Sequence, residues 1–464
     1  MPRVTLLVLF VGCGFAASID TRIHREFQHV SIGASVVVAP EDLSAYEATF
    51  LQPDASAPDG LVRIPAEHVD SGWVADLDDA LPLQFTLPDF PTPIVRFSDF
   101  PQRRLTSVFA VLEHPAPQLA PMGSMISLDV SLDRALQGGE ALIAYVVGSW
   151  SSFAIPTATI TFPHESMVSL SGRPHSAFTR DDAMFVLRTD GRAVTGVAAI
   201  APFDEATTNA LVGTMVPVVQ DQRLAVQIDR DVATTRLLGA TPALSSINAA
   251  WSLTAAPGAA YAQSTGPALG SGTLGPGATV LDAAYGNPFA DRGWPALLFW
   301  QAYGSRVVQT RLLPVTLVGG IYEYRTAAAG GTSALPAGLP QAVTFDGMPL
   351  TADNLMLARP TRPVEIKFLS DRPENTGVYS LALYELVPNI PATALTYKTI
   401  ASFSGTEPRF LVPPELFVPD HLYVFRAVTS TGGYDIESFA SGDLTKRVLP
   451  FAVGYFDAGV FEVH

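Results

Sequence analysis

The chain has 464 residues, of which 48 % are hydrophobic and only 16 % are charged. This composition supports buried cores in about two to four domains and excludes a largely disordered chain. A formal net charge of −16 repels phosphates and anionic lipid surfaces, so we expect neither nucleic acid nor an anionic membrane surface as a direct ligand.

The N-terminus has the pattern of an export signal. Arg3 precedes an apolar stretch, residues 4–11, which has the length of a signal-peptide core and is too short to span a bilayer, since that needs ~20 residues. The stretch runs into Phe10-Val11-Gly12-Cys13, and Cys13 is the sole cysteine. A lone cysteine cannot form an internal disulfide. The tetrapeptide resembles the lipobox of bacterial lipoproteins.

The resemblance implies cleavage before Cys13 and a diacylglycerol on its thiol, so that the partner of this region is a membrane. Several acyl chains are needed for a stable anchor, and lipoproteins carry them on this one residue. Gly14 rather than Asp follows the cysteine, which in the family's sorting rule favours the outer membrane. We therefore predict a signal peptide over residues 1–12 and a tether over 13–29. The alternative is an ordinary signal peptide cut near residues 16–17.

After the tether, strand signals dominate, and they predict an all-β chain of antiparallel sandwiches. Short apolar and β-branched runs end at proline or glycine, which is typical of such folds. The runs fall into an N-terminal β-domain over 30–120 and a middle β-region over 121–345. Asp190-Gly191 between apolar runs predicts a hairpin with a type I′ turn. Only two short helices are expected, over 41–50 and 204–212.

Two segments rich in small residues, 255–277 and 327–340, suggest seams within the middle region. Between them the chain is dense in aromatic residues: Tyr285, Phe289, Trp294, Phe299, Trp300, Tyr303, Tyr322 and Tyr324. Because these alternate with leucine and valine, we interpret them chiefly as a core. A sugar-binding role for the same rings is the open alternative.

The C-terminal segment, residues 357–464, has the clearest alternation of apolar and polar residues and predicts one antiparallel sandwich. Residues 422–428 read Leu-Tyr-Val-Phe-Arg-Ala-Val, which is similar to a strand of fibronectin type III domains. The resemblance implies that Tyr423 forms a tyrosine corner and that Phe368 replaces the usual early tryptophan. The strand alternation predicts six inward side chains: Ile366, Phe368, Leu381, Leu383, Tyr423 and Phe425. A last hairpin is expected across residues 457–459.

Motifs that carry chemistry are weak throughout. Residues 270–275 match GxGxxG, but no helix signal follows, so a flexible loop is predicted in place of a nucleotide site. The histidines lack the paired spacing of metal sites, and His68 beside Asp70 is the one local acid–base pair. Acidic clusters at 76–79, 181–182 and 229–231 suit solvated turns, with Ca²⁺ binding as the alternative. We therefore predict no catalytic, cofactor-binding or metal residue.

The leading hypothesis is a membrane-anchored exported lipoprotein with a binding, adhesion or scaffolding role. The sequence does not identify its ligand, for which a protein and a glycan are the two candidates. The alternative is an exported hydrolase with its catalytic centre in residues 120–345 and the C-terminal sandwich as an accessory. A jelly-roll coat protein is a third hypothesis, which the export signal disfavours. A cleft with converging acidic, histidine and serine side chains would favour the hydrolase.

Overall fold

The computed structural model confirms a strand-dominated fold with several, mostly antiparallel sheets. Because hydrophobic runs are short and interrupted by proline and glycine, the chain forms strands rather than long helices. The structure describes residues 18–30, 36–41, 47, 49–54, 56–57, 61–69, 72–78, 83–87, 94–98, 106–111, 125–146, 151–163, 184–201, 210–240, 244–256, 267–333, 337–433 and 449–464.

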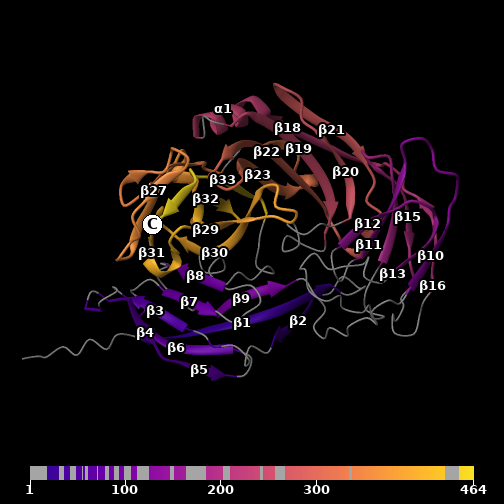
Figure 1. Cartoon of the computed structure of the whole chain (residues 1–464). Coiled ribbons are helices and arrows are strands. Elements are labelled where there is room, and N and C mark those ends of the chain that lie inside the picture. The colour runs from indigo at the N-terminus through magenta and orange to yellow at the C-terminus, as the bar shows by residue number, and fades with distance from the viewer. Residues whose placement is uncertain are drawn as a thin grey trace, which may run out of the picture.

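Five of the N-terminal strands form one sheet, within the part of the chain drawn in indigo to purple in Figure 1. It comprises β1 (Ser18–Val30), β2 (Val36–Glu41), β5 (Ala66–Val69), β6 (Gly72–Asp78) and β9 (Thr106–Val111). Strand β1 corrects the predicted tether, because residues 18–29 pair with β2, β6 and β9. The many polar residues of this segment are what suggested a tether.

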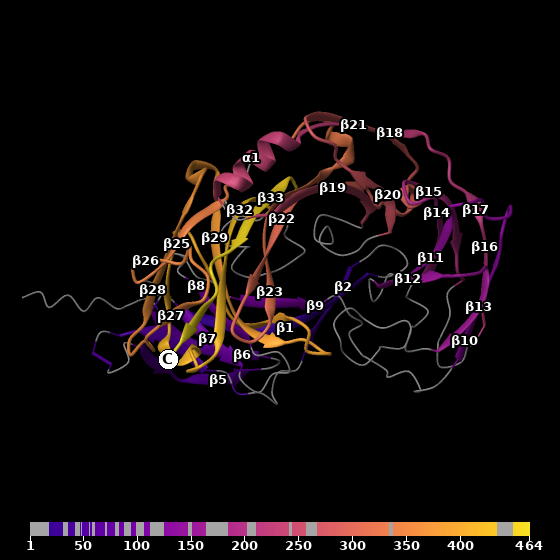
Figure 2. The same cartoon turned by 45° about the horizontal axis from the view of Figure 1, so that its top comes forward.

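A second group of strands forms two small sheets, at the end of the molecule away from the C-terminus in Figures 1 and 2. One holds β10 (Met125–Ser131), β13 (Thr159–Pro163) and β16 (Ala210–Thr214); the other holds β11 (Ala141–Val146), β12 (Ser151–Ile155), β14 (Met184–Thr189), β15 (Val194–Ala199) and β17 (Val216–Pro217). The predicted hairpin joins β14 to β15. Its turn is not type I′, since only Gly191 has a positive φ there and Asp190 instead accepts two backbone hydrogen bonds.

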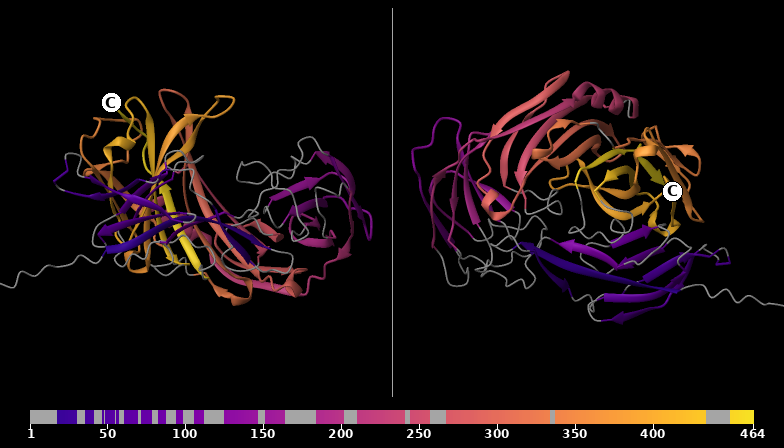
Figure 3. Two further views of the ribbon diagram at one scale, coloured as in Figure 1. Left: turned by 90° about the horizontal axis from the view of Figure 1, so that it is seen from below. Right: turned by 180° about the vertical axis from the view of Figure 1, so that it is seen from behind.

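The largest sheet has 14 strands and runs through the centre of the molecule (Figures 1 and 3). Its strands are β3 (Thr49–Pro53), β4 (Leu61–Ile64), β7 (Leu83–Leu87), β8 (Ile94–Ser98), β19 (Ser246–Ala255), β20 (Ala268–Thr273), β22 (Ala296–Gln309), β23 (Pro314–Thr326), β27 (Leu355–Leu357), β29 (Val378–Pro388), β30 (Leu395–Gly405), β32 (Leu422–Gly432), β33 (Phe451–Asp457) and β34 (Phe461–Val463). The pairs β23–β33 and β8–β30 link segments that the sequence had assigned to separate domains.

One helix, α1 (Arg230–Ala240), covers a face of this sheet together with β18 (Gln222–Asp229), β21 (Ala278–Tyr285) and β24 (Gly331–Thr332). The sequence did not predict α1, whereas the two helices that it did predict are not found among the described residues. Glu41 ends β2 and Thr49 begins β3, while residues 210–212 lie in β16. Short 3-10 turns occur at Ala290–Arg292, Ala327–Ala329, Pro373–Asn375 and Pro414–Leu416.

A four-stranded sheet packs on the C-terminal strands and completes a sandwich. Its strands are β25 (Pro340–Phe345), β26 (Met348–Pro349), β28 (Val364–Ser370) and β31 (Arg409–Val412). All six side chains predicted to face inward are buried: Ile366, Phe368, Leu381, Leu383, Tyr423 and Phe425. The sandwich begins before residue 357, since β25 pairs with β28.

The corner geometry predicted for Tyr423 is also present. Its buried hydroxyl accepts a 2.7 Å hydrogen bond from the backbone N–H of Val418, five residues earlier. The buried Phe368 ring packs against those of Tyr379 and Phe410, with centroid distances of 5.9 and 6.1 Å. The likeness to fibronectin type III domains as a family stays a prediction.

The expected final hairpin across residues 457–459 is wrong. Strands β33 and β34 do not pair with each other but lie one after the other along the same edge of β32. β33 pairs with residues 426–432 of β32, and β34 pairs with Leu422 and Tyr423. Three residues, 458–460, thus face two residues of β32, which is the pattern of a β-bulge. Gly459 suits this place because a Cβ there would lie 2.1 Å from the carbonyl oxygen of Ala352.

Candidate functional site

An open hollow of about 530 Å³ lies on one face of the central sheet, within the roughly 300–1,000 Å³ of small-molecule sites. Four adjacent strands, β22, β23, β33 and β32, form its floor. Four aromatic rings, three valines and two polar side chains line it: Phe299, Tyr322, Tyr324, Tyr455, Val318, Val428, Val453, Gln301 and Arg426. The hollow therefore presents apolar rings and valines together with two polar side chains.

Strand alternation explains why these rings face the hollow and others do not. On β22, Trp300 is fully buried on the face toward α1, whereas its neighbours Phe299 and Gln301 lie half-buried on the opposite face. On β23, Tyr322 and Tyr324 are two residues apart and share that opposite face. The aromatic segment thus contributes to both faces of one sheet, because successive residues of each strand point to opposite sides.

Three rings and one guanidinium form a row across the four strands, which we call the aromatic row: Phe299, Tyr322, Tyr455 and Arg426. The Phe299 and Tyr322 ring centroids are 5.8 Å apart, and those of Tyr322 and Tyr455 are 6.2 Å apart. The Arg426 guanidinium carbon lies 5.6 Å from the Tyr455 centroid. Each member of the row lies on the strand next to that of the previous member, two residues away from the previous member's direct pairing partner. This is the diagonal-neighbour position of an antiparallel sheet.

Gly320 on β23 gives the Tyr455 ring its place against the sheet. The two residues pair across β23 and β33. A Cβ on Gly320 would lie 2.7 Å from the Tyr455 hydroxyl oxygen and 2.9 Å from the ring, closer than side-chain atoms approach one another. Any larger residue would push the ring away from the floor of the hollow.

Asp457 holds Arg426 in position at the end of the aromatic row. Its fully buried carboxylate accepts hydrogen bonds from Arg426 Nε at 2.7 Å and Nη2 at 3.1 Å. The Val318 N–H and the Tyr397 hydroxyl donate to the same carboxylate, at 2.9 and 2.8 Å. Tyr384 also flanks the guanidinium, 5.3 Å from its ring centroid. This network fixes the direction of Arg426 and neutralises its charge.

The pKa values of this network follow from burial and charge. Burial and the Asp457 carboxylate both raise the pKa of Tyr397, which therefore stays a neutral donor. Burial alone would lower the pKa of Arg426, but the hydrogen bonds and charge of Asp457 outweigh it and raise that pKa. Arg426 is thus a permanent cation.

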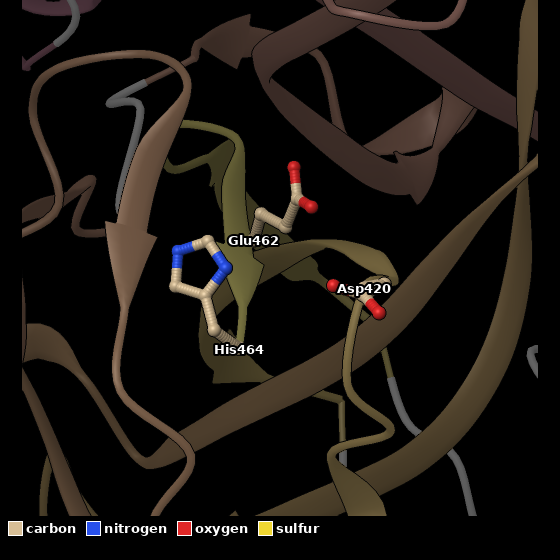
Figure 4. A group of neighbouring side chains, drawn as sticks. All are labelled: Asp420, Glu462 and His464. Atoms are coloured by element: carbon tan, nitrogen blue, oxygen red, sulfur yellow. The ribbon is translucent and has the colours of Figure 1, made fainter.

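A second cluster gathers Asp420, Glu462 and His464 near the start of β32 and the end of β34 (Figure 4). One ligand atom from each lies within 4.8 Å of the others, and two carboxylates with an imidazole suit a divalent cation. However, Arg311 Nε donates to Glu462 at 2.7 Å and already balances its charge. We therefore assign no function to this cluster, which also lies outside residues 120–345.

The other residues that the sequence singled out have structural roles where they are described. Asp229 Oδ1 accepts from the Val232 N–H and caps α1, while Asp231 Oδ1 accepts from the Gly277 N–H. His68 packs edge-on against Trp73 at 5.1 Å. The backbone of residues 76–78 lies in β6. Some predictions concern residues that lie outside the described part of the chain, namely Cys13, Asp70, Asp79 and residues 181–182 and 204–209.

The GxGxxG segment is a strand in place of the predicted flexible loop. Residues 270–273 belong to β20, which pairs with β19. The indole of Trp251 lies across Gly272, where a Cβ would come within 2.8 Å of its Nε1. The glycines therefore make room for a tryptophan, and no helix follows that could receive a phosphate.

No protein-family model and no curated protein matches this chain. Within the described residues, the structure contains no helix that is both long and apolar enough to cross a membrane.

Proposed function

We propose that this protein is an exported lipoprotein, anchored through Cys13, whose folded body binds a ligand in the hollow of the central sheet. The single observation that carries the binding role is the lining of the hollow. It offers aromatic and aliphatic surface with two polar side chains, Gln301 and Arg426. Such a lining suits recognition of a ligand by shape and contact.

The same lining favours binding over hydrolysis. Hydrolysis needs a nucleophile or an activated water with a general base beside it. Among the residues that the structure describes, those that line the hollow include no serine, histidine or carboxylate. The adjacent carboxylate, Asp457, is fully buried and accepts four hydrogen bonds, so it is poorly placed to take a proton from a substrate.

The anchor is supported by the lipobox-like Phe10-Val11-Gly12-Cys13. Wild-type protein expressed in a bacterial host should incorporate labelled palmitate and sediment with membranes. Cys13→Ser should lose the label and move to the soluble exported fraction, because the acyl chains have no other thiol to join. An unlabelled wild-type protein would overturn the anchor.

The binding site is tested with 3-fluorotyrosine incorporated into the full chain, which has 13 tyrosines. Single Tyr→Phe variants assign the ¹⁹F resonances, and cocktails of small polar and aromatic fragments are then added. We expect shifts at Tyr322, Tyr324 and Tyr455 and none at the control Tyr285, which is buried beside another sheet. Fragments that shift other tyrosines but leave these three unchanged would overturn the proposed site.

A further inference from the structure

We propose that the ligand of the hollow is a neutral, linear oligosaccharide that lies along the aromatic row, from Phe299 across Tyr322 and Tyr455 to Arg426. This inference rests on the proposed binding function and names its ligand class. It follows from the spacing of the row, the chemistry of its rings, its charge and its place on the sheet.

The row has a regular step. Successive members are separated by 5.8, 6.2 and 5.6 Å, and each belongs to the next strand of the sheet. This repeat is close to the length of one hexose unit in an extended chain. The rings are tilted by 49° and 56° to one another. Rotation about glycosidic bonds lets consecutive sugars follow such a turn.

The ring chemistry suits sugars. A pyranose has a face of C–H bonds and a rim of hydroxyls, so it needs an apolar plate with hydrogen-bonding groups at its edge. Tyrosine provides both in one side chain. Tyr322 and Tyr455 are half-buried in the floor of the hollow, and the Gln301 amide and the Arg426 guanidinium lie beside them. A purely apolar ligand would leave these polar groups dehydrated without partners.

The charge of the site selects a neutral chain over an acidic one. The cation of Arg426 is compensated by the buried carboxylate of Asp457, so the hollow presents a directed donor and little net charge. The chain as a whole carries −16, which disfavours the approach of polyanions. Neutral hydroxyls therefore match the site better than uronic or sialic acids do.

The place of the row on the sheet disfavours an extended peptide. Peptides that bind to sheets usually add a strand at a free edge, where the backbone finds partners. The four strands below the row are interior strands of the sheet, since β22 also pairs with β19 and β32 also pairs with β29. A peptide laid over this face would have few partners for its backbone groups, whereas a sugar turns its apolar face to the rings.

The test is calorimetric titration of the full chain with neutral linear hexasaccharides of glucose, xylose, mannose and N-acetylglucosamine. At least one should bind. Tyr322→Leu and Tyr455→Leu keep an apolar side chain but remove the plate, so each should weaken binding roughly three- to tenfold. The matched variants Tyr322→Phe and Tyr455→Phe keep the ring but lose the hydroxyl, so each should weaken binding less than the leucine variant at the same position. Unchanged near-ultraviolet circular dichroism shows that each variant is folded.

Failure of the two proposals can be told apart. If fragments shift the fluorotyrosine resonances of the hollow but no neutral hexasaccharide binds at millimolar concentration, the glycan inference is overturned and the binding site stands. Tighter binding of an oligogalacturonate or of an extended heptapeptide would also overturn it, as would leucine variants that bind like wild type. If neither fragments nor saccharides bind, both proposals fail.

Discussion

Replacing Asp457 by asparagine tests how the hollow is held together. The substitution keeps the shape of the side chain but removes the charge that faces Arg426. The wild-type carboxylate has no exposed surface and accepts four hydrogen bonds, two of them from Arg426. In the variant one of these donors faces an amide N–H₂ group, and the guanidinium loses its counter-ion.

The magnitude follows from burial. Breaking a buried ion pair by removing one partner costs ~3–5 kcal/mol. Because a quarter of the Arg426 side chain, 25 %, remains exposed to water, we expect a loss near the lower end, about 3 kcal/mol in the free energy of unfolding. Arg426→Met should cost a similar amount, since it leaves Asp457 buried without its cation.

The assay is urea unfolding followed by tryptophan fluorescence, because Trp300 and Trp251 lie in the same sheet. The double variant Asp457→Asn with Arg426→Met removes both charges. It should lose at least about 1 kcal/mol less than the sum of the two single losses, as coupled neighbours do. Losses that add within about 0.3 kcal/mol would refute the argument that these two residues act as a pair.

Other outcomes test the remaining packing and electrostatics. Phe425→Ala should lower the free energy of unfolding by ~3–5 kcal/mol because it leaves a cavity. Tyr423→Phe should lower it by ~1 kcal/mol through loss of the corner hydrogen bond. A Phe425→Ala variant that is as stable as wild type in urea unfolding would contradict the strand register. Hydrogen bonds from Arg134 lower the pKa of Glu140 from 4.5 to about 2, so this carboxylate stabilises the fold above pH 4.5, and the contribution is lost as the pH falls toward 2. Glu140→Gln should therefore be less stable than wild type at pH 7, and the difference should vanish near pH 2; a difference that does not change with pH would contradict the assignment.

The sequence predicted those parts of the fold in which apolar and polar residues alternate along a strand, because the alternation shows which face of the strand is buried. Alternation over residues 364–368 was sufficient to place Phe368 in the core, because a one-residue slip would have buried Glu365 and Lys367. On β32 both faces are buried at this point, since Tyr423 and Phe425 belong to one hydrophobic cluster and Leu422 and Val424 to another. The prediction failed where the chain departs from regular pairing. Asp457-Ala458-Gly459 has the composition of a turn but forms a bulge, since the partner strand β32 continues past it.

The aromatic segment shows why the site was only partly predictable. Its residues were interpreted chiefly as a core, which holds for Phe289, Trp294 and Trp300. Phe299 and Tyr322 lie on the other side of the sheet, and the period of two between neighbours was the signal that could have separated them. The sequence could not reveal that Tyr455 and Arg426 continue the row, because they reach it only through the long-range pairings of β23 with β33 and of β33 with β32.

The same limit applies to Asp420, Glu462 and His464, which are brought together by the pairing of β32 with β34. Residues that converge through long-range strand pairing leave no local spacing to recognise. The acidic cluster at 229–231 was expected in a solvated turn, whereas Asp229 caps α1 and Asp231 accepts a hydrogen bond from the Gly277 N–H.

The most direct test of the glycan proposal is a crystal structure of the chain soaked with the neutral hexasaccharide that binds most tightly. The account predicts sugar rings stacked on Tyr322 and Tyr455, with hydroxyls at Gln301 and at the guanidinium of Arg426. A saccharide that is ordered elsewhere on the protein while the aromatic row stays bare would contradict it.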